Sequence, residues 1–569
     1  MVTQAEVVST EQYISGAGLR AWQWFAQRSD RQILLLLLTI AAIVFANSLR
    51  NHFVYDDYLL IVSNNALRDW SYFSRAFIDP PAYDVSWLNS KSGVTLHYRP
   101  FTRMLFALAF QMFGEYEPYW HLLNLLLFLG IVALAYVVVR QLSGARAVAA
   151  LSLLLFISHP IHSEVVAWVN CLGDTLHALF FLAGFALYLQ ARAQQSRIFL
   201  LGSMVLVLAA LLSKEAALCF PILVAFHQLI FIKESNFIKR TIKAMGATLP
   251  FLAMVVIYLG LRYYAYGGSG RIGLGANMKL DAVLLTIPEV ILEYLRILIF
   301  PMGLSAIYSL SPVTSLASLA FWLPLLLLIA IAAIIWLRTP NTIIFAAGWI
   351  LITLMPVLNL GAFRPGLIVQ DRYAFLPSLG FSIALAIGLN ALFESKAILV
   401  YIKSLIVGGC IAMIIGFSIM TIRQNSFWYS DLDLWKRAVA ENTTSELAHC
   451  NYASALYIEG KKDEAANHYQ FSLALKNGES GCACTGLGLY YSSLGDYDRA
   501  TYFYERTIEM NAVNNLLVYT NLAQIYIKRG QRSKAIELLS RTTANYPDFQ
   551  QARLLLEQIT TTEDRRIGE

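Results

Sequence analysis

Charged residues are scarce in this chain. Of its 569 residues only 14% are charged, while 57% are hydrophobic, whereas a soluble globular protein carries roughly 25% charged residues. This scarcity excludes a soluble globular protein. A net charge of +6 without any run of basic residues also argues against nucleic acid as a partner. Long apolar segments are present instead, and they predict an integral membrane protein embedded in a lipid bilayer.

Cysteine is also rare, with six residues in the whole chain. None of them shows the CxxC spacing of a zinc site. The one close pair is Cys482 and Cys484, and we interpret both as small buried thiols within a helical repeat.

An HxxH sequence, His159 to His162 followed by Glu164, resembles a metal-binding pattern. Pro160 interrupts a helix there, so the three side chains do not converge on one helical face. We therefore predict no metal site, and favour hydrogen bonding around a cavity or packing at a helix end. No cofactor is assigned, and the sequence leaves open a requirement for Mg²⁺ or Mn²⁺.

Apolar segments of membrane-spanning character continue to about residue 421. The first, Gln32 to Leu49, contains no charge and is long enough to cross ~30 Å of hydrocarbon. It lies too far from Met1, and is too long, for a cleaved signal peptide, so we interpret it as a signal anchor. We predict eleven spans, at residues 32–49, 119–139, 146–158, 174–191, 198–213, 216–232, 245–262, 320–337, 341–358, 374–393 and 398–421.

The last part of the chain, residues 423–569, repeats itself with a period of 35 residues. Glycine recurs at 460, 495 and 530, a small alanine follows each glycine by five residues, and a bulky residue follows four further on. These residues are Ala465, Ala500 and Ala535, then Tyr469, Tyr504 and Leu539. The pattern is typical of tetratricopeptide repeats. We expect a short solenoid that binds a peptide or protein, with a packing brace for the membrane domain as the alternative.

Predicted loops that carry basic residues alternate along the chain with predicted loops that are poor in them. The loops that carry Arg140 and Arg146, Arg192 and Arg197, and Lys233 to Lys243 are predicted to be cytoplasmic by the positive-inside rule, as is the N-terminal segment 1–31. Segment 287–301 is ambiguous, because it is apolar but carries a polar stripe.

The polar stripe consists of Glu289, Glu293 and Arg296 at i, i+4 and i+7, which is typical of an amphipathic helix at the membrane interface. Without this segment there are eleven spans, and the repeats lie on the outer side with the first outer loop, 50–103. With it there are twelve, and the repeats lie in the cytoplasm. We adopt eleven.

Ionisable residues gather on the predicted outer face, at the ends of apolar spans. Such residues are costly near hydrocarbon and commonly mark a site, although Lys214 and Glu215 have internal ion pairing as an even alternative. Carboxylates suit a general base, while Arg and Lys suit a phosphate leaving group. The combination predicts group transfer from a lipid phosphate. The residues are Asp56, Asp57, Arg99, His159, His162, Glu164, Asp174, Lys214, Glu215, Arg364, Asp371 and Arg372.

Several motifs together resemble one known family, the transmembrane and tetratricopeptide repeat-containing O-mannosyltransferases. They are "FVYDDYLLIVSN", "YRPFTRMLF", "HLLNLLLF", "HPIHSEVVAWV", "LSKEAAL" and "DRYAFLPSLGF". The match runs from about residue 50 to 440 in the same order, and the repeats follow as they do in that family. Only about three repeats are clear, so the chain is more similar to a compact prokaryotic relative.

The resemblance implies an all-α GT-C glycosyltransferase bundle over residues 32–422, a polyprenyl-phosphate sugar donor and a hydroxyl-bearing protein acceptor. It implies inverting transfer of a mannose-like sugar, with Asp56 as the general base beside Asp57. Arg372, Lys214, Arg364 and Arg99 would bind the donor phosphate. His159, His162, Glu164, Asp174, Glu215 and Asp371 would line the cavity or orient the acceptor. The chain departs from the family at Leu172-Gly173, where Arg-Ala is usual, and at Asp371, where Glu is usual.

Two alternatives belong to other classes. One is an oligosaccharyltransferase similar to O-antigen ligases, which would place its large functional loop late in the membrane domain. The other is a non-catalytic, membrane-anchored repeat scaffold, which gives no reason for outer-face charges to converge. For location we expect the bacterial inner membrane with periplasmic repeats, and the endoplasmic reticulum membrane with lumenal repeats as the alternative.

Overall fold

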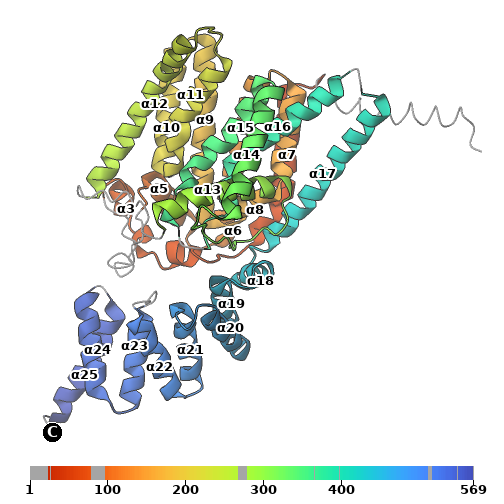
Figure 1. Ribbon diagram of the computed structural model, residues 1–569. Helices are drawn as coiled ribbons and strands as arrows, with labels where there is room; N and C mark the ends of the chain where they lie inside the picture. Colours follow the sequence, from red (N-terminus) through yellow and green to blue (C-terminus); the bar gives the residue numbers. More distant parts are fainter. Residues whose placement is uncertain are drawn as a thin grey trace, which may run out of the picture. The chain divides into compact units, whose positions relative to one another are not determined.

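The structure is a computed structural model that describes residues 24–25, 27–78, 97–266, 278–363, 366–395, 398–510, 516–547 and 549–567. Every regular element of these residues is helical, which confirms the expected fold class. The described chain forms two compact units, which divide between Ser430 and Asp431 (Figure 1). The last helix of the first unit, α17 (Val400–Ser426), extends four residues past the expected boundary between residues 422 and 423. That boundary stays a prediction.

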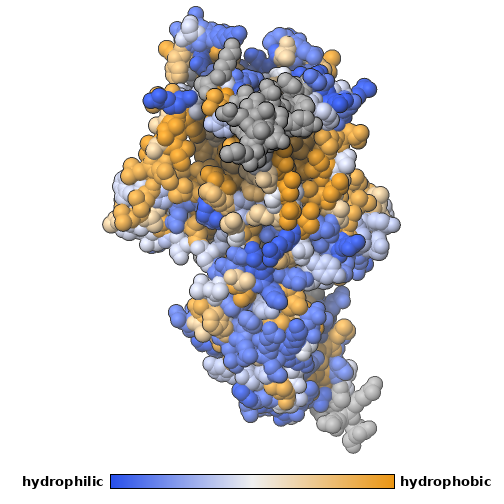
Figure 2. Space-filling model, turned by 90° about the vertical axis from the view of Figure 1, so that its right-hand side faces the viewer, coloured by the Kyte–Doolittle hydropathy of each residue, from blue (hydrophilic) through white to orange (hydrophobic). Residues whose placement is uncertain are grey.

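The first unit is a bundle of apolar helices. Eight helical segments of the described chain are long and apolar enough to cross a membrane, and a bent pair, Arg146–Ser158 with Pro160–Ala167, adds a ninth. Arg197–Ser213 and Glu215–Phe231 are shorter apolar helices. All eleven predicted spans coincide with these helices, and the number of crossings stays a prediction. Figure 2 shows hydrophobic residues gathered in a band over this unit.

The main elements of this unit are α2 (Asp30–Phe45), α5 (Pro100–Phe113), α6 (Glu117–Ser143), α7 (Arg146–Ser158), α8 (Ser163–Ala167), α9 (Leu172–Gln194), α10 (Arg197–Ser213), α11 (Phe220–Phe231), α12 (Phe237–Ala265), α13 (Leu280–Ile299), α14 (Leu319–Arg338), α15 (Asn341–Leu354), α16 (Phe375–Glu394) and α17 (Val400–Ser426). Small residues allow close helix packing, as is usual within membranes. A Cβ atom added to Gly380 of α16 would lie 2.6 Å from the Ala346 carbonyl oxygen of α15.

Pro160 ends helix α7, as its missing N–H predicts. The chain bends by 58° between α7 and α8. The bend places the polar residues from His159 to Glu164 at one end of the bundle instead of along a continuous span.

Contacts between distant segments fix which helix ends lie together. Asp30, at the start of α2, forms ion pairs with Arg140 at 3.4 Å and Arg146 at 3.3 Å. At the other end of α2, the Asn51 amide donates to the Asn425 carbonyl at 3.2 Å, and the His52 N–H donates to the Tyr429 carbonyl at 3.0 Å. The chain therefore leaves the first unit at the end that carries Asp56 and Asp57.

Helix α13 is the ambiguous segment of the sequence. Val290, Tyr294 and Ile297 are buried on one face, while Glu293 and Arg296 form an ion pair at 2.8 Å. Within the described chain α13 does not meet the criteria for a membrane span. Its contacts agree with the expected amphipathic helix.

The second unit consists of paired helices: α18 (Asp431–Glu441), α19 (Glu446–Ile458), α20 (Lys462–Leu475), α21 (Gly481–Ser493), α22 (Tyr497–Glu509), α23 (Leu517–Lys528), α24 (Arg532–Asn545) and α25 (Gln550–Ile567). The repeated alanines are fully buried, and the bulky residues four positions on are also buried. The repeated glycines have φ of 82°, 77° and 72°, a conformation that suits glycine between two helices. The predicted repeat structure is confirmed.

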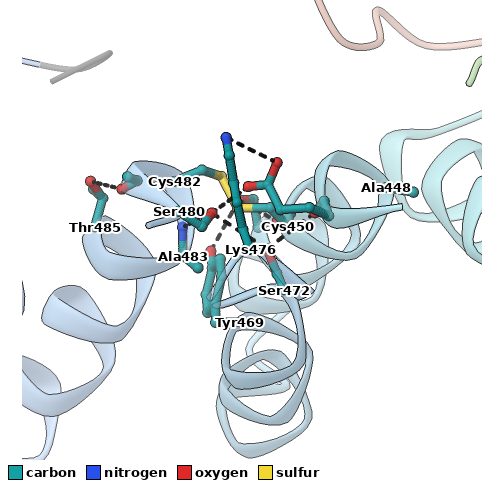
Figure 3. Close-up of a disulfide and its surroundings, with 12 residues drawn as sticks. Ala448, Cys450, Tyr469, Ser472, Lys476, Ser480, Cys482, Ala483 and Thr485 are labelled. Carbon is teal, nitrogen blue, oxygen red and sulfur yellow. Dashed lines mark hydrogen bonds and ion pairs between the residues drawn. A yellow bond between two sulfur atoms is a disulfide. The ribbon is translucent and has the colours of Figure 1, made fainter. Parts of the chain in front are cut away.

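A disulfide joins two helices of neighbouring repeats. Cys450 of α19 and Cys482 of α21 are bonded, with their Cα atoms 6.3 Å apart (Figure 3). Our interpretation of Cys482 as a free thiol is therefore wrong, because stacking of the repeats brings its side chain to a cysteine 32 residues away. Cys484 is a buried thiol, as expected.

Candidate functional site

The polar residues of the predicted outer face lie at helix ends. Asp174 lies in the first turn of α9, and Lys214 directly follows α10. Arg99 precedes α5, and Asp371 and Arg372 begin the 3₁₀ turn that leads into α16. Helix ends thus bring side chains from distant parts of the sequence to one end of the bundle.

The two adjacent aspartates have different surroundings. Asp57 is fully buried, and its carboxylate accepts hydrogen bonds from the backbone N–H groups of Asn170 at 2.8 Å and Val54 at 3.1 Å. Asp56 is partly exposed. Asp57 therefore joins the loop after α2 to the segment before α9, while Asp56 lies on the accessible side of the turn.

Glu164 and Arg372 form a buried ion pair. The Glu164 side chain is 1% exposed and the Arg372 side chain 18%. One carboxylate oxygen accepts from the Arg372 guanidinium, and the other accepts from its backbone N–H at 2.9 Å. The guanidinium carbon lies 5.2 Å from the Trp168 ring centre and 5.1 Å from that of Tyr373, within range of cation–π attraction.

Two further ion pairs lie at this end. Lys214 bonds Asp174, and the two side chains are 10% and 15% exposed. Arg99 forms a bidentate pair with Glu215, at 2.8 and 2.5 Å. The internal ion pairing that the sequence left open for Lys214 and Glu215 is thus observed. Arg372 and Arg99 also act electrostatically on Asp174, so the pairs form one network.

His97 extends this network, with its Nδ1 atom 3.2 Å from Glu215. The positive charge of Arg99 lowers the pKa of His97. The imidazole therefore favours its neutral form beside the guanidinium.

Asp371 is buried and accepts a hydrogen bond from the Tyr308 hydroxyl. Burial, followed by the negative charge of Asp371, raises the pKa of Tyr308 well above its usual range. The hydroxyl therefore stays protonated at neutral pH and acts as the donor. Tyr308 could not be predicted as a member of the site, because it lies in an irregular segment without ionisable neighbours in the sequence.

The two histidines of the HxxH sequence lie inside the bundle. His159 Nε2 lies 3.0 Å from the Leu298 carbonyl. The His162 ring packs against Phe156 and Phe375, with ring centres 4.3 and 5.0 Å apart. These contacts favour the helix-end packing interpretation over a role in orienting an acceptor.

The described residues contain no group of three or more His, Cys, Asp or Glu side chains that could hold a metal ion. Arg364 lies outside the described residues. A cavity of about 410 Å³, lined by Gln141, Gln190 and His227 among others, lies near the other ends of α6 and α9. It is separate from the charged network.

The arrangement defines a class: a multi-pass helical membrane protein with a charged network at one end of its bundle, followed by tetratricopeptide repeats. Residues 492–559 match the family model described as tetratricopeptide repeat. The resemblance expected from the motifs is confirmed, since the curated relatives are protein O-mannosyl-transferases.

Protein O-mannosyl-transferase TMTC4 of Homo sapiens is 25% identical over 76% of this chain and 65% of its own length. Protein O-mannosyl-transferase TMTC3 of Mus musculus is 24% identical over 91% of this chain and 60% of its own length. The chain thus spans less than two thirds of these relatives. Among solved structures, ArnT from Cupriavidus metallidurans bound to undecaprenyl phosphate aligns with a TM-score of 0.40 and 16% identity, over 84% of this chain and 80% of that one.

The role of Asp57 in this site is testable through stability. We expect Asp57→Asn to lower the free energy of unfolding by about 1.5–3 kcal/mol, the usual contribution of hydrogen bonds to a charged group. An amide can keep only one of the two backbone contacts. Asp56→Asn, at the partly exposed neighbour, serves as the matched control and should shift stability less. Thermal unfolding of both purified variants checks this, and equal shifts would contradict it.

Proposed function

We propose that this chain is an inverting membrane glycosyltransferase. It moves a mannose-like sugar from a polyprenyl-phosphate donor to a hydroxyl group of a protein acceptor. The names of the curated relatives support the reaction class. The observation that carries the assignment of the site is the Asp56–Asp57 turn, in which one carboxylate is fixed by backbone donors and the other stays partly exposed.

The reaction requires a base and a leaving group. The acceptor oxygen attacks the anomeric carbon, the bond between that carbon and the phosphate oxygen breaks, and the lipid phosphate leaves from the opposite face. Asp56 takes the hydroxyl proton during the attack. Asp57 orients the turn, because both of its oxygens are held by the backbone.

Arg372 and Lys214 are the proposed donor-phosphate ligands, with Arg99 and Arg364 as further members of the set. A guanidinium matches phosphate oxygens and stabilises the charge that develops on the leaving group. Arg372, Lys214 and Arg99 each bind a carboxylate in the structure. An incoming phosphate therefore shares these cations with Glu164, Asp174 and Glu215, which would adjust the position of the cations.

The Cys450–Cys482 disulfide supports an extracytoplasmic location for the repeats, because disulfides persist in oxidising compartments. The chain also leaves the bundle at the end that carries Asp56. We assign both to the periplasm of a bacterial inner membrane, with the endoplasmic reticulum lumen as the alternative, and assign acceptor binding to the repeats.

The sidedness is tested in cells that carry the full chain. A reporter fused after Glu569 should be active outside the cytoplasm, and non-reducing peptide mapping should recover the peptide linked through Cys450 and Cys482. A reporter active only in the cytoplasm, with both cysteines alkylated without reduction, would contradict the proposed sidedness.

The donor site is tested with Arg372→Ala. Loss of charge-assisted hydrogen bonds of about 1.5–3 kcal/mol should raise the KM or Kd for the polyprenyl-phosphate sugar by about 10- to 100-fold. Glu164→Gln is the matched control, because it breaks the same ion pair but leaves the guanidinium in place. If Arg372→Ala binds the donor as tightly as Glu164→Gln and the unchanged protein do, the phosphate site lies elsewhere.

The base is tested with Asp56→Asn, which keeps the shape of the side chain but removes its basicity. We expect a folded protein that binds donor normally and transfers sugar at least about 100-fold more slowly, since positioned bases contribute about 10²–10⁴-fold. Single-turnover transfer, measured after a check of thermal stability, is the assay. Normal transfer by this variant and by Asp57→Asn would remove the base from this loop.

A further inference from the structure

The turn that carries Asp56 has an unusual backbone. Tyr55, its immediate neighbour, has φ of 54°, in the left-handed region where bulky residues are rare. Among the described residues other than glycine, only Gln195 and Asn477 share this feature, and both lie where a helix has just ended. The Tyr55 conformation lies instead inside the proposed catalytic turn.

Aromatic contacts hold this turn. The Tyr55 ring stacks on Trp168, with ring centres 5.7 Å apart and an interplanar angle of 26°. Trp168 also stacks with Trp428, at 5.3 Å and 22°. The Trp168 indole donates to the Val54 carbonyl at 3.3 Å. Both tryptophans are buried, so the stack is part of the packed interior and restricts the Tyr55 ring.

The stack includes the segment that follows the last helix of the bundle. Trp428 and Tyr429 come after α17 and precede α18 in the chain. Tyr429 accepts the His52 N–H at 3.0 Å, and its ring packs edge-on against the His52 ring at 5.0 Å. The same short segment thus contacts His52 directly and reaches Tyr55 through Trp168.

We propose that Tyr55 is a positioning residue for Asp56. Its ring is held by Trp168, which itself stacks on Trp428, and keeps the left-handed conformation that aims the next side chain. Any other conformation at Tyr55 would rotate the Asp56 carboxylate away from its present direction. Trp428 makes this direction depend on the segment that leads into the repeats. The inference rests on the proposed role of Asp56 as the base.

The experiment separates the effect of the Tyr55 ring on kcat from the effect of the backbone conformation at residue 55. Tyr55→Phe keeps a ring that stacks, whereas Tyr55→Asn suits the left-handed conformation but removes the ring. We expect Tyr55→Phe to keep kcat near the unchanged value and Tyr55→Asn to lower it by up to about 100-fold, the scale of a small misplacement of a catalytic group. The KM for donor should be unchanged. Tyr58→Asn, at an exposed tyrosine of the same loop, is the matched control and should keep kcat.

The link to Trp428 is tested by a double-mutant cycle. Trp428→Ala should lower kcat, Trp428→Phe should restore it, and Tyr55→Asn combined with Trp428→Ala should be no slower than the worse single variant. Additive losses of kcat in the double variant would overturn the link between Trp428 and Tyr55.

Normal kcat in Tyr55→Asn, or equal losses of kcat in Tyr55→Phe and Tyr55→Asn, would overturn the role of the Tyr55 ring. Asp56→Asn is assayed in parallel to separate failure of the proposed base from failure of the role of Tyr55. If Asp56→Asn transfers sugar normally, the proposed base is overturned. If Asp56→Asn is inactive while Tyr55→Asn is normal, only the role of Tyr55 is overturned.

Discussion

The buried ion pair between Glu164 and Arg372 is the contact on which the charged end of the bundle depends. It joins the segment after Pro160 to the start of α16, 208 residues further along the chain. Removing one partner of a buried pair costs about 3–5 kcal/mol, because the other charge is left without compensation. The pair also places the Arg372 guanidinium beside Trp168 and Tyr373. Through Trp168 it lies next to the turn of Tyr55, so one ion pair connects the late and early parts of the site.

Three cations of this end each bind one carboxylate, and this pairing has a physical cause. An unpaired charge near hydrocarbon is strongly unfavourable. Pairing Arg372, Lys214 and Arg99 with Glu164, Asp174 and Glu215 places a carboxylate beside each of these three cations. The same pairing limits affinity for anions, because a new anion competes with a carboxylate already in place. An anion that displaces one of these carboxylates would need several oxygens, as a phosphate has, to accept hydrogen bonds from neighbouring donors.

Local patterns explain which features could be predicted from the sequence. The 35-residue period, the apolar spans and the break at Pro160 each depend on residues close together in the chain. The partners of charged residues could not be predicted, since Arg99 and Glu215 are 116 residues apart and many other pairings were compatible with the sequence. The Tyr308–Asp371 bond and the Cys450–Cys482 disulfide were missed for the same reason. The six ion-paired members of the charged network could be named from the sequence, whereas His97 was not. Which residues pair depends on the tertiary structure.

The contacts of His52 with Tyr429 and of Asn51 with Asn425 join two parts of the first unit that lie far apart in the chain. Counting spans places the repeats on one side or the other according to whether α13 is included. The backbone hydrogen bond from His52 to Tyr429 does not depend on that count, because it requires the end of α17 and the segment from His52 to Asp57 to lie at the same end of the bundle. The segment that enters the repeats is thus packed against the loop of Asp56. A substitution in either segment therefore has to preserve this packing, whichever side of the membrane the repeats occupy.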